Sequence, residues 1–269
     1  MTDFGRYTVQ RVLGRGAAAD AFLCTDGGRS VVVKARAVND PQLRARIAAD
    51  PALEERSVAR FLAERDLLDA LRHPNVVELL DAGTTDTGTP YFVMPFLKTG
   101  LVDVLRPLDV ATEPRVTRAV AISLLQGVLS GLAPAHERGV VHRDVRPANV
   151  RLIGESGMAV VCDFGSAKSP ALGGQWFRPV GVRPFASPEQ LVDSDAADAR
   201  ADVYAVGVLA HLMLTGHLSG PAAIASGALH RRVGDALAGW VAAAMNPVRE
   251  RRPANAGTAL AMLNQAAGA

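Results

Sequence analysis

The chain has 269 residues, of which 49% are hydrophobic and 21% are charged. This length and composition exclude a disordered tail and a small disulfide-stapled domain, and they allow one large core or two lobes. With 29 basic and 27 acidic residues the net charge is +2, which gives no sign of a nucleic-acid partner. The two cysteines are too few for a disulfide framework, so we expect a reducing, cytoplasmic location.

No segment has the pattern of a signal peptide or a membrane span. The first seven residues include Asp3 and Arg6 and no apolar run. Residues 119–135 and 203–230 lack Asp, Glu, Lys and Arg, but glycine, proline and polar residues interrupt both stretches. A membrane span needs about 20 continuous apolar residues, so we expect both stretches to form buried helices of a large lobe.

The first hundred residues consist of short apolar runs separated by turns. Strands are predicted at residues 7–14, 21–25, 30–36, 76–80 and 91–94. The Asp-Gly-Gly-Arg sequence at residues 26–29 predicts a hairpin turn between the second and third strands. Apolar residues recur at helical spacing over residues 50–73, and residues 39–55 hold extra length that we expect to form an added helix, as a solvated insertion or a partner surface.

Residues 101–269 are mainly helical in pattern, with short strands predicted at residues 140–141, 150–152 and 159–162. No fixed-period repeat is present. The sequence therefore predicts an α+β fold, in which a small antiparallel-sheet lobe with one main helix precedes a larger, mainly helical lobe. This division would place a cleft near residues 95–100.

A glycine-containing turn joins the first two predicted strands. Gly14 and Gly16 occupy the first two places of a Gly-x-Gly-x-x-Gly pattern, and Ala19 fills the third. Glycine at these places lets the backbone approach phosphate oxygens and offer them its N–H groups. Taken alone, the segment favours an ordinary hairpin.

Lys34 ends an apolar strand, where alternation places it on the same face as Val32. An edge lysine that reaches solvent is the simpler alternative. That alternative is weakened because only three of the 29 basic residues are lysines. Glu64 lies in the predicted helix, nine residues before His73, and by itself would be a solvated carboxylate.

The strongest signal is the sequence His142-Arg143-Asp144-Val145-Arg146-Pro147-Ala148-Asn149, which follows an apolar strand. An aspartate can orient a hydroxyl group and accept its proton, and an asparagine oxygen can bind a hard cation. Fourteen residues after Asn149, Asp163-Phe164-Gly165 follows another apolar strand. Two cation-binding side chains at neighbouring strand ends suit a Mg²⁺ ion that bridges phosphates.

Together these motifs resemble the signature of protein kinases over about residues 7–261, and they are most similar to the eukaryotic-type Ser/Thr kinases of bacteria. Ser187-Pro188-Glu189 stands at the Ala-Pro-Glu place, and residues 202–207 begin the expected central helix. The resemblance implies one two-lobed, kinase-like domain over residues 1–269, with the N-lobe at 1–95 and the C-lobe at 96–269. It also implies that Glu189 pairs with Arg252 and that Asp202 anchors the backbone at His142 and Arg143.

The resemblance implies transfer of the γ-phosphoryl group of ATP, with Mg²⁺, to Ser/Thr hydroxyls of an unidentified protein substrate. Asp144 would position the substrate hydroxyl with Arg146 nearby, and Asn149 and Asp163 would bind Mg²⁺. Lys34 would hold the α- and β-phosphates and pair with Glu64. The residues implied to contact ATP are Leu13, Gly14, Gly16, Ala21, Val32, Lys34, Met94 (the gatekeeper), Pro95 and Leu97. We expect Lys34, Asp144, Asn149 and Asp163 to converge on one triphosphate.

Several positions depart from the family pattern. Arg146 replaces the usual lysine and Val182 the usual threonine, which suggests that one hydrogen-bonded trio was remodelled; for Arg146, drift in an arginine-rich chain is the alternative. Val32 is larger and Ala21 smaller than usual, so the pocket volume is expected to be conserved. Between Asp163 and Glu189 there is no threonine, and the serines stand near the ends of the segment, so we expect activity without phosphorylation there.

Three other functions stay open. A pseudokinase or weakly active scaffold that binds nucleotide and a protein partner is favoured by Arg146, Val182 and Ala19. A small-molecule kinase is disfavoured by the Ser-Pro-Glu segment and by Arg252. A binding module without a nucleotide leaves Lys34 and the motifs at residues 142–149 and 163–165 unexplained. Because the sequence has no transmembrane helix or sensor domain, we expect a regulatory partner or an unlinked cue to supply the input.

Overall fold

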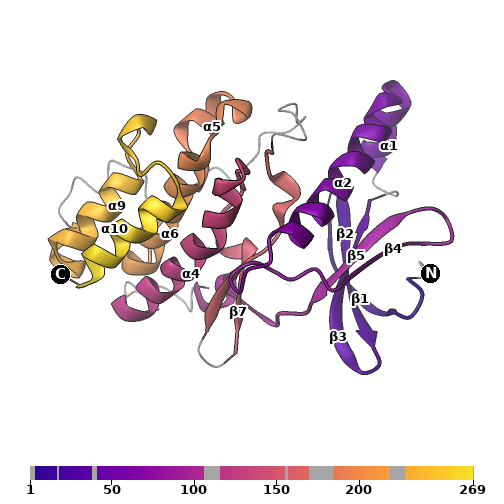
Figure 1. Cartoon of the computed structure of the whole chain (residues 1–269), viewed down its shortest axis with the longest axis horizontal. Helices are drawn as coiled ribbons and strands as arrows, with labels where there is room; N and C mark the ends of the chain where they lie inside the picture. Colours follow the sequence, from indigo (N-terminus) through magenta and orange to yellow (C-terminus); the bar gives the residue numbers. More distant parts are fainter. Residues whose placement is uncertain are drawn as a thin grey trace. The chain divides into compact units, whose positions relative to one another are not determined.

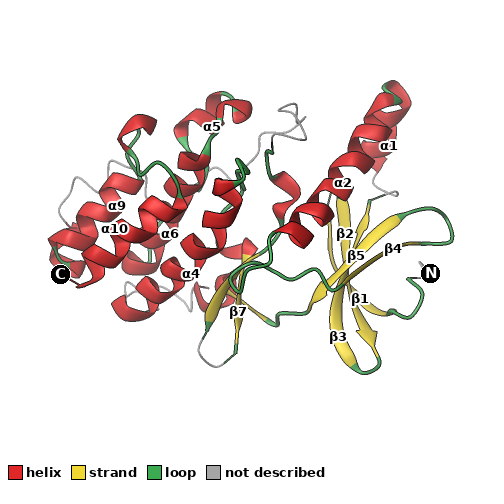
Figure 2. Ribbon diagram, viewed as in Figure 1, coloured by secondary structure: helices red, strands yellow, loops and turns green. Residues whose placement is uncertain are grey.

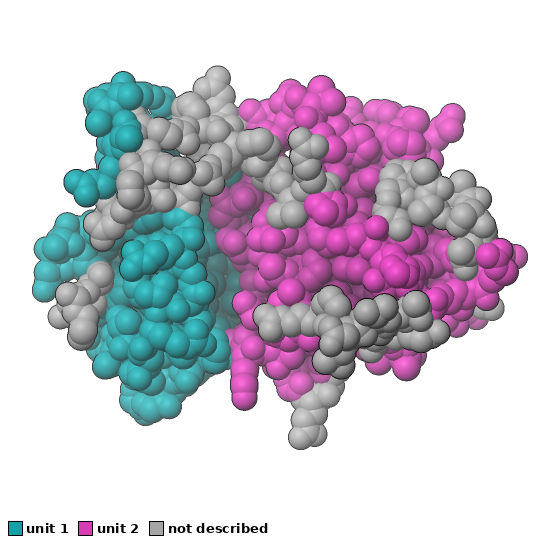
Figure 3. All heavy atoms as spheres, turned by 180° about the vertical axis from the view of Figure 1, so that it is seen from behind, with its two compact units in different colours: residues 1–73, 77–96 teal, residues 74–76, 97–269 magenta. Residues whose placement is uncertain are grey.

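The computed structural model describes residues 4–16, 18–37, 41–105, 116–154, 157–169, 184–218 and 228–268. The chain divides into two compact units, which Figure 3 colours separately. Unit 1 comprises Met1–His73 and Val77–Phe96, and unit 2 comprises Pro74–Val76 and Leu97–Ala269. Each unit has its own β-sheet, with five described strands in unit 1 and three in unit 2.

Unit 1 is built on an antiparallel sheet with the strand order β1-β2-β3-β5-β4 (Figures 1 and 2). Its strands are β1 (Thr8–Arg15), β2 (Ala19–Asp26), β3 (Arg29–Arg36), β4 (Asp81–Thr84) and β5 (Pro90–Pro95). Gly27 and Gly28 join β2 to β3 with φ angles of 54° and 91°. A two-residue hairpin turn requires positive φ at its central residues, which glycine adopts without steric cost. The predicted hairpin at residues 26–29 is confirmed.

Strand β3 presents two different faces. Val32 and Lys34 are half-buried and alternate with the buried residues Val31, Val33 and Ala35, which confirms the predicted alternation. The buried face packs into a core that also includes Phe4, Tyr7, Cys24 and Val93. On the other face, Lys34 pairs in register with Phe92, whose ring lies 5.1 Å from that of Phe61 in helix α2. Helix α2 therefore covers the face that carries Lys34.

Two helices lie between β3 and β4. Helix α1 (Pro41–Ala49) confirms the added helix expected within residues 39–55. Helix α2 (Ala52–Ala70) is shorter than the predicted helix at residues 50–73. It ends where the Leu71 N–H donates to Leu67 O at 2.9 Å. Pro74 disfavours helical backbone at the residue before it, which gives the helix a stop at this point.

Two predicted strands are wrong. Residues 76–80 form no strand: Val76 makes an isolated parallel bridge to Val161 in unit 2, whereas the Leu80 N–H donates to Val93 O in unit 1 at 2.8 Å. Residues 140–141 likewise form only a bridge, between Val141 and Lys168. The valines at 76, 77, 140 and 141 are buried, but no described segment runs beside either run long enough to form a ladder of hydrogen bonds.

Unit 2 combines a small sheet with helices (Figure 2). The sheet has the order β6-β7-β8, formed by β6 (Thr99–Gly100), β7 (Val150–Ile153) and β8 (Met158–Val161). The described helices are α3 (Leu101–Leu105), α4 (Arg118–Glu137), α5 (Pro188–Val192), α6 (Ala199–Thr215), α8 (Ala228–Val233), α9 (Asp235–Ala244) and α10 (Ala256–Gly268). Short 3-10 turns occur at Pro147–Asn149, Phe164–Ser166, Ser194–Ala196 and Arg249–Arg251.

Helices α4 and α6 form the centre of unit 2. Most residues of α6 are buried, and α4 packs against α6, α10 and β8. Helix α4 is long enough and apolar enough to cross a membrane, but buried core helices often meet the same two criteria. Its apolar face, including Leu125, Val128 and Leu132, is buried within unit 2. The expectation of buried helices is therefore confirmed at residues 119–135 and over α6, whereas residues 219–227 lie outside the described part of the chain.

Candidate active site

Asp202, at the start of α6, anchors the loop that carries Asp144. Its carboxylate is fully buried and accepts the backbone N–H groups of His142 at 2.7 Å and Arg143 at 2.8 Å. This is the anchoring role that the sequence analysis expected of Asp202. The two hydrogen bonds fix the backbone just before Asp144.

His136, near the end of α4, gives Asp202 a further partner that the sequence analysis missed. Its Nδ1 accepts the backbone N–H of Ala256 at 3.0 Å, so the ring proton must lie on Nε2 and is donated to Asp202 at 2.8 Å. Burial raises the pKa of the Asp202 carboxyl, but the hydrogen bond from His136 and the contacts at His142 outweigh it and hold that pKa below its ordinary value. Asp202 therefore stays ionised inside the unit.

Asp144 and Asn149 lie in direct contact. The Asn149 Nδ2 group donates to both the backbone oxygen and Oδ2 of Asp144, each at 2.8 Å. Arg146 approaches the same Oδ2 with its Nε at 3.3 Å. Burial is the main cause that raises the pKa of Asp144 above its ordinary value, and Arg146 opposes this rise. The loop thus holds a carboxylate with strengthened basicity.

Asp163 follows β8 by two residues, and its segment contacts the loop that carries Asp144. Three contacts join the two segments: Cys162 N–H to Asn149 O at 2.9 Å, a His142 ring nitrogen to Cys162 O at 3.1 Å, and the His142 and Phe164 rings at 4.6 Å. Asp163 has a φ of 64°, and Arg143 is the other described non-glycine residue with positive φ, at 66°. Such backbone strain persists where surrounding contacts enforce it.

The donor atoms on these segments fit a magnesium ion. Both hydrogens of the Asn149 amide are used by Asp144, which leaves the amide oxygen for another partner. Together with the carboxylate of Asp163, this supplies two hard oxygen donors. Mg²⁺ commonly takes only one or two protein oxygens and completes its shell with phosphate and water.

In unit 1, Lys34 and Glu64 form the predicted ion pair. Lys34 Nζ lies 2.7 Å from Oε1 and 2.9 Å from Oε2 of Glu64, and the side chains are 14% and 5% exposed. Two residues further along β3, Arg36 pairs with Glu54 at 2.6 Å. Both contacts tie β3 to α2; the second one was missed because neither residue stands in a recognisable motif.

Several residues expected to contact ATP share one sheet face in unit 1. Ala21 lies opposite Lys34 and Val32 opposite Met94 in the strand register. Opposed residues, and residues two apart on one strand, project to the same face. The other residues of the set within unit 1 lie outside the regular pairing. Leu13 and Gly14 lie at the register shift of β1, Gly16 follows the end of β1, and Pro95 is the last residue of β5. Leu97 is the first residue after the return of the chain to unit 2.

The turn at Gly16 is tight. The Gly16 N–H donates to Ala19 O at 3.0 Å, and a Cβ atom at residue 16 would lie 2.8 Å from that same oxygen. A side chain could be accommodated only if the backbone moved. The second glycine of the predicted phosphate-binding turn is thus required by the local geometry.

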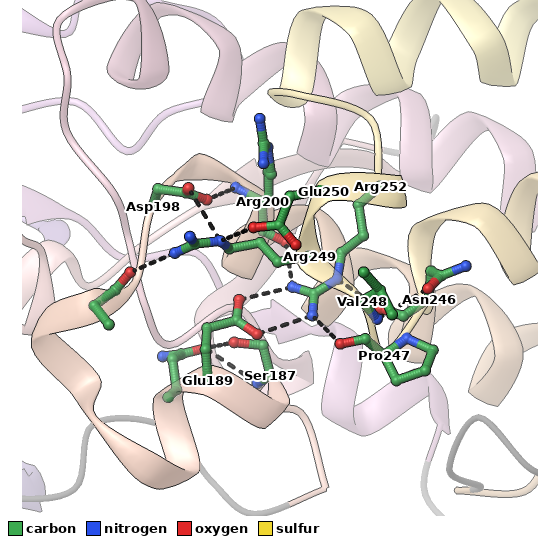
Figure 4. A network of polar contacts seen from close by, with 12 residues as sticks. Ser187, Glu189, Asp198, Arg200, Asn246, Pro247, Val248, Arg249, Glu250 and Arg252 are labelled. Atoms are coloured by element: carbon green, nitrogen blue, oxygen red, sulfur yellow. Dashed lines mark hydrogen bonds and ion pairs between the residues drawn. The ribbon is translucent and has the colours of Figure 1, made fainter.

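Figure 4 shows the ion pair between Glu189 and Arg252, which was also predicted. The two carboxylate oxygens accept from Nη1 and Nη2 at 2.7 and 2.8 Å, and the Arg252 side chain is fully buried. Arg252 also donates to the carbonyl of Asn246 at 2.7 Å and lies over the Tyr204 ring. The pair links α5 to the turn before α10.

Val182 departs from the family pattern, as Arg146 does. It lies in residues 170–183, outside the described residues, so its proposed coupling to Arg146 stays a prediction.

Comparisons with known proteins agree with these features. The model of the protein kinase domain family matches residues 7–235. "Probable serine/threonine-protein kinase SCO3848" of Streptomyces coelicolor is 34% identical over 220 residues, which cover 78% of this chain and 30% of that protein. Serine/threonine-protein kinase PknB of Mycobacterium tuberculosis is 34% identical over 218 residues, covering 78% of this chain and 32% of PknB.

The fold is also similar to a solved structure. A double mutant of the Mycobacterium tuberculosis PknI kinase domain superposes with a TM-score of 0.67 at 24% identity, covering 98% of this chain and 97% of the other. The two-lobed α+β fold expected from the sequence is thereby confirmed. The chain spans about a third of the length of SCO3848 and PknB. By the match over residues 7–235 and these relatives, the chain belongs to the protein kinase family.

Proposed function

We propose that the chain transfers the γ-phosphoryl group of ATP, with Mg²⁺, to serine or threonine hydroxyls of a protein substrate. The observation that carries the proposal is the arrangement in unit 2: Asn149 donates to the carboxylate of Asp144 at 2.8 Å, and the N–H of Cys162, the residue before Asp163, donates to Asn149 O at 2.9 Å. A base for the hydroxyl and two oxygen donors for a cation are thus held in one place. Membership of the protein kinase family supports the same reaction.

Each group then has a defined task. Asp144 accepts a hydrogen bond from the substrate hydroxyl, orients its oxygen toward the γ-phosphorus and takes up the proton as the new P–O bond forms and ADP leaves. Burial raises the pKa of Asp144, which makes it a stronger base, while Arg146 keeps a positive charge beside it. Asn149 and Asp163 would hold Mg²⁺, which when bound neutralises charge on the phosphate oxygens.

Unit 1 supplies the remaining groups. The Lys34 ammonium, oriented by Glu64, would hold the α- and β-phosphates. Backbone N–H groups at the turn around Gly14 and Gly16 would approach the phosphates, and the sheet face with Ala21, Val32 and Met94 would pack against adenine. These contacts position the nucleotide, and positioning with charge neutralisation accounts for most of the rate in phosphoryl transfer.

The test is transfer of radiolabelled γ-phosphate from ATP to the purified chain and to Ser/Thr peptides, beside the variants Asp144→Asn and Lys34→Met. Label on wild-type protein or peptide, lost at least about 100-fold in Asp144→Asn, is the expected result. Binding of ATP·Mg²⁺ in a thermal-shift assay without any transfer would instead favour the nucleotide-binding scaffold. Transfer that is unchanged in Asp144→Asn would contradict the assignment of the base.

A further inference from the structure

The peptide that precedes Asp144 is held on both sides. Arg143 has a φ of 66°, its N–H donates to Asp202 at 2.8 Å, and its carbonyl accepts from Nε2 of Gln190 at 3.0 Å. Gln190 is 4% exposed and belongs to α5, directly after the Ser187-Pro188-Glu189 segment. A non-glycine residue with positive φ costs about 1 kcal/mol or more, so these contacts keep the loop in a conformation it would otherwise leave.

The side chain of Arg143 is buried as deeply as its backbone, with 1% exposure. Its Nε donates to Ser166 O at 2.8 Å, and Nη1 donates to Ser194 O and to Oδ1 of Asp195, both at 3.3 Å. Both serines accept through their backbone carbonyl oxygens, which carry no charge. Among the described residues, Asp195 is therefore the carboxylate in ion-pair contact with this guanidinium. A buried charge without a counter-ion would be strongly destabilising.

Asp195 is itself fixed in place. It lies in the 3-10 turn Ser194–Ala196, whose start is capped by the Asp193 side chain at 2.9 Å from Asp195 N. Lys168 Nζ donates to the backbone oxygens of Asp195 and Ala197. The backbone of Lys168 exchanges two hydrogen bonds with Val141, at 2.9 and 2.8 Å. The turn thus connects the segment after Asp163 to the loop that carries Asp144.

We propose that Asp195 is a positioning residue for the phosphotransfer reaction: its carboxylate is a permanent counter-charge for Arg143 and holds the Asp144 loop in place without a phosphate group. This inference rests on the proposed function. The sequence agrees with it, because residues 164–187 contain no threonine or tyrosine and have serine only at positions 166, 169 and 187. Ser187 is fully buried and its hydroxyl is bonded to Gln190 at 3.0 Å, which removes it as a site for a kinase to modify.

The kinetic test compares Asp195→Asn and Asp195→Glu with the control Asp193→Asn. The control removes one charge from the same turn but keeps a capping side chain of equal quality, and Asp193 does not pair with Arg143. We expect Asp195→Asn to lower kcat about 10-fold with KM for ATP unchanged, Asp195→Glu to restore at least half of kcat, and the control to stay within about twofold. Phosphatase treatment should leave wild-type kcat within about twofold.

A second measurement does not depend on catalysis. Amide hydrogen exchange of His142 and Arg143 should become at least about 10-fold faster in Asp195→Asn than in Asp193→Asn, because both N–H groups belong to the loop that Arg143 holds. If the wild type transfers no phosphate, the proposed function fails, and exchange alone decides the role of Asp195. Unchanged exchange and kcat in Asp195→Asn, or loss of wild-type activity after phosphatase treatment, would overturn the inference.

Discussion

Lys34 and Arg36 lie two residues apart on β3 and each binds a glutamate of α2. The Lys34 ammonium lies within 2.9 Å of both carboxylate oxygens of Glu64, and Arg36 pairs with Glu54 at 2.6 Å. Because residues 34 and 36 project to the same face of the strand, the helix is attached to the sheet at two points along its length.

Glu64→Gln should lower phosphoryl transfer without unfolding the chain. The amide keeps the shape of the side chain but removes the charge that orients Lys34, while Arg36 and Glu54 still hold the helix. We expect kcat/KM for ATP to fall on the order of 10- to 100-fold, the loss typical of a misplaced binding group. Steady-state kinetics and thermal unfolding check this, with the exposed Glu55→Gln of the same helix as control. Equal kinetics for both variants would refute a role for Glu64.

Some residues of the site could be predicted from the sequence and others could not. Lys34, Glu64 and Asp144 stand at fixed places in motifs, because the chemistry of one substrate dictates both residue type and spacing. Gln190 and Asp195 carry no such signal: the first binds a backbone carbonyl 47 residues away and the second a side chain 52 residues away. Any polar residue can meet such a partner, so only the folded chain reveals them.

At the scale of elements, helix α4 passes very close to the chain before β4. A Cβ atom at Gly131 would lie 2.4 Å from the backbone oxygen of Asn75, whose side chain also donates to Ala159 O at 2.7 Å. The Asn75 carbonyl in turn accepts the N–H of Val161 at 2.8 Å. Residue 75 is therefore fixed between α4 and β8, and it cannot move aside for a larger residue on the helix.

Gly131→Ala should accordingly destabilise the chain. The added methyl group meets backbone that is already hydrogen-bonded, and overpacking of this kind costs about 1–3 kcal/mol in the free energy of unfolding. Gly239→Ala is the matched control, since Gly239 lies in helix α9 with no atom within 4 Å of its Cβ position. There the substitution should stabilise by about 0.5–1 kcal/mol through helix propensity. Urea unfolding measures the change in the free energy of unfolding of each variant, which should be opposite in sign. An unchanged stability of Gly131→Ala would mean that α4 and Asn75 can separate to make room for the methyl group.

The Glu189–Arg252 pair makes the stability of unit 2 depend on pH. Burial alone would raise the pKa of Glu189, but the hydrogen bonds and charge of Arg252 hold it below its ordinary value. The carboxylate therefore contributes its stability above the ordinary glutamate range, and the contribution is lost as the pH falls through the lowered folded-state pKa.

Glu189→Gln removes this contribution and leaves the fully buried Arg252 without its counter-ion. We expect the free energy of unfolding to fall by about 3 kcal/mol at neutral pH. The difference from wild type should shrink as the pH falls below the ordinary glutamate range and through the lowered pKa of the folded-state Glu189, because the native carboxylate then also loses its charge. Denaturant unfolding at a series of pH values tests this, and a difference that persists undiminished in acid would show that the lost packing, not the lost charge, is responsible.

The two strands that the sequence analysis placed wrongly show what a local pattern lacks. The apolar runs at residues 76–80 and 140–141 correctly indicated that their valines are buried, yet a strand also needs a parallel or antiparallel neighbour over several residues. The two ends of the first run have different partners: Val76 forms a bridge with Val161 in unit 2, and the Leu80 N–H donates to Val93 O in unit 1. Periodicity reports burial along the chain, whereas pairing depends on contacts that are distant in sequence.

At the scale of the whole molecule, the proposed reaction requires both units to act on one nucleotide. Lys34 and Glu64 belong to unit 1, whereas Asp144, Asn149 and Asp163 belong to unit 2. A ligand that binds only the folded chain stabilises it by RT ln(1 + [L]/Kd), which is about 2.7 kcal/mol at 100 times Kd. If nucleotide binding uses groups from both units, a substitution in either unit should raise Kd and reduce this stabilisation.

ATP·Mg²⁺ at saturating concentration should raise Tm of the wild type by at least about 5 °C. Lys34→Met should remove most of this shift, whereas the exposed Lys98→Met should keep it. Because Asp163 would act through the metal, omitting Mg²⁺ should reduce the wild-type shift but have little further effect on Asp163→Asn. Differential scanning fluorimetry with and without Mg²⁺ gives all of these values. A Tm shift that stays at the wild-type value in both Lys34→Met and Asp163→Asn would place the nucleotide elsewhere on the molecule. It would remove the basis for assigning the reaction to these residues.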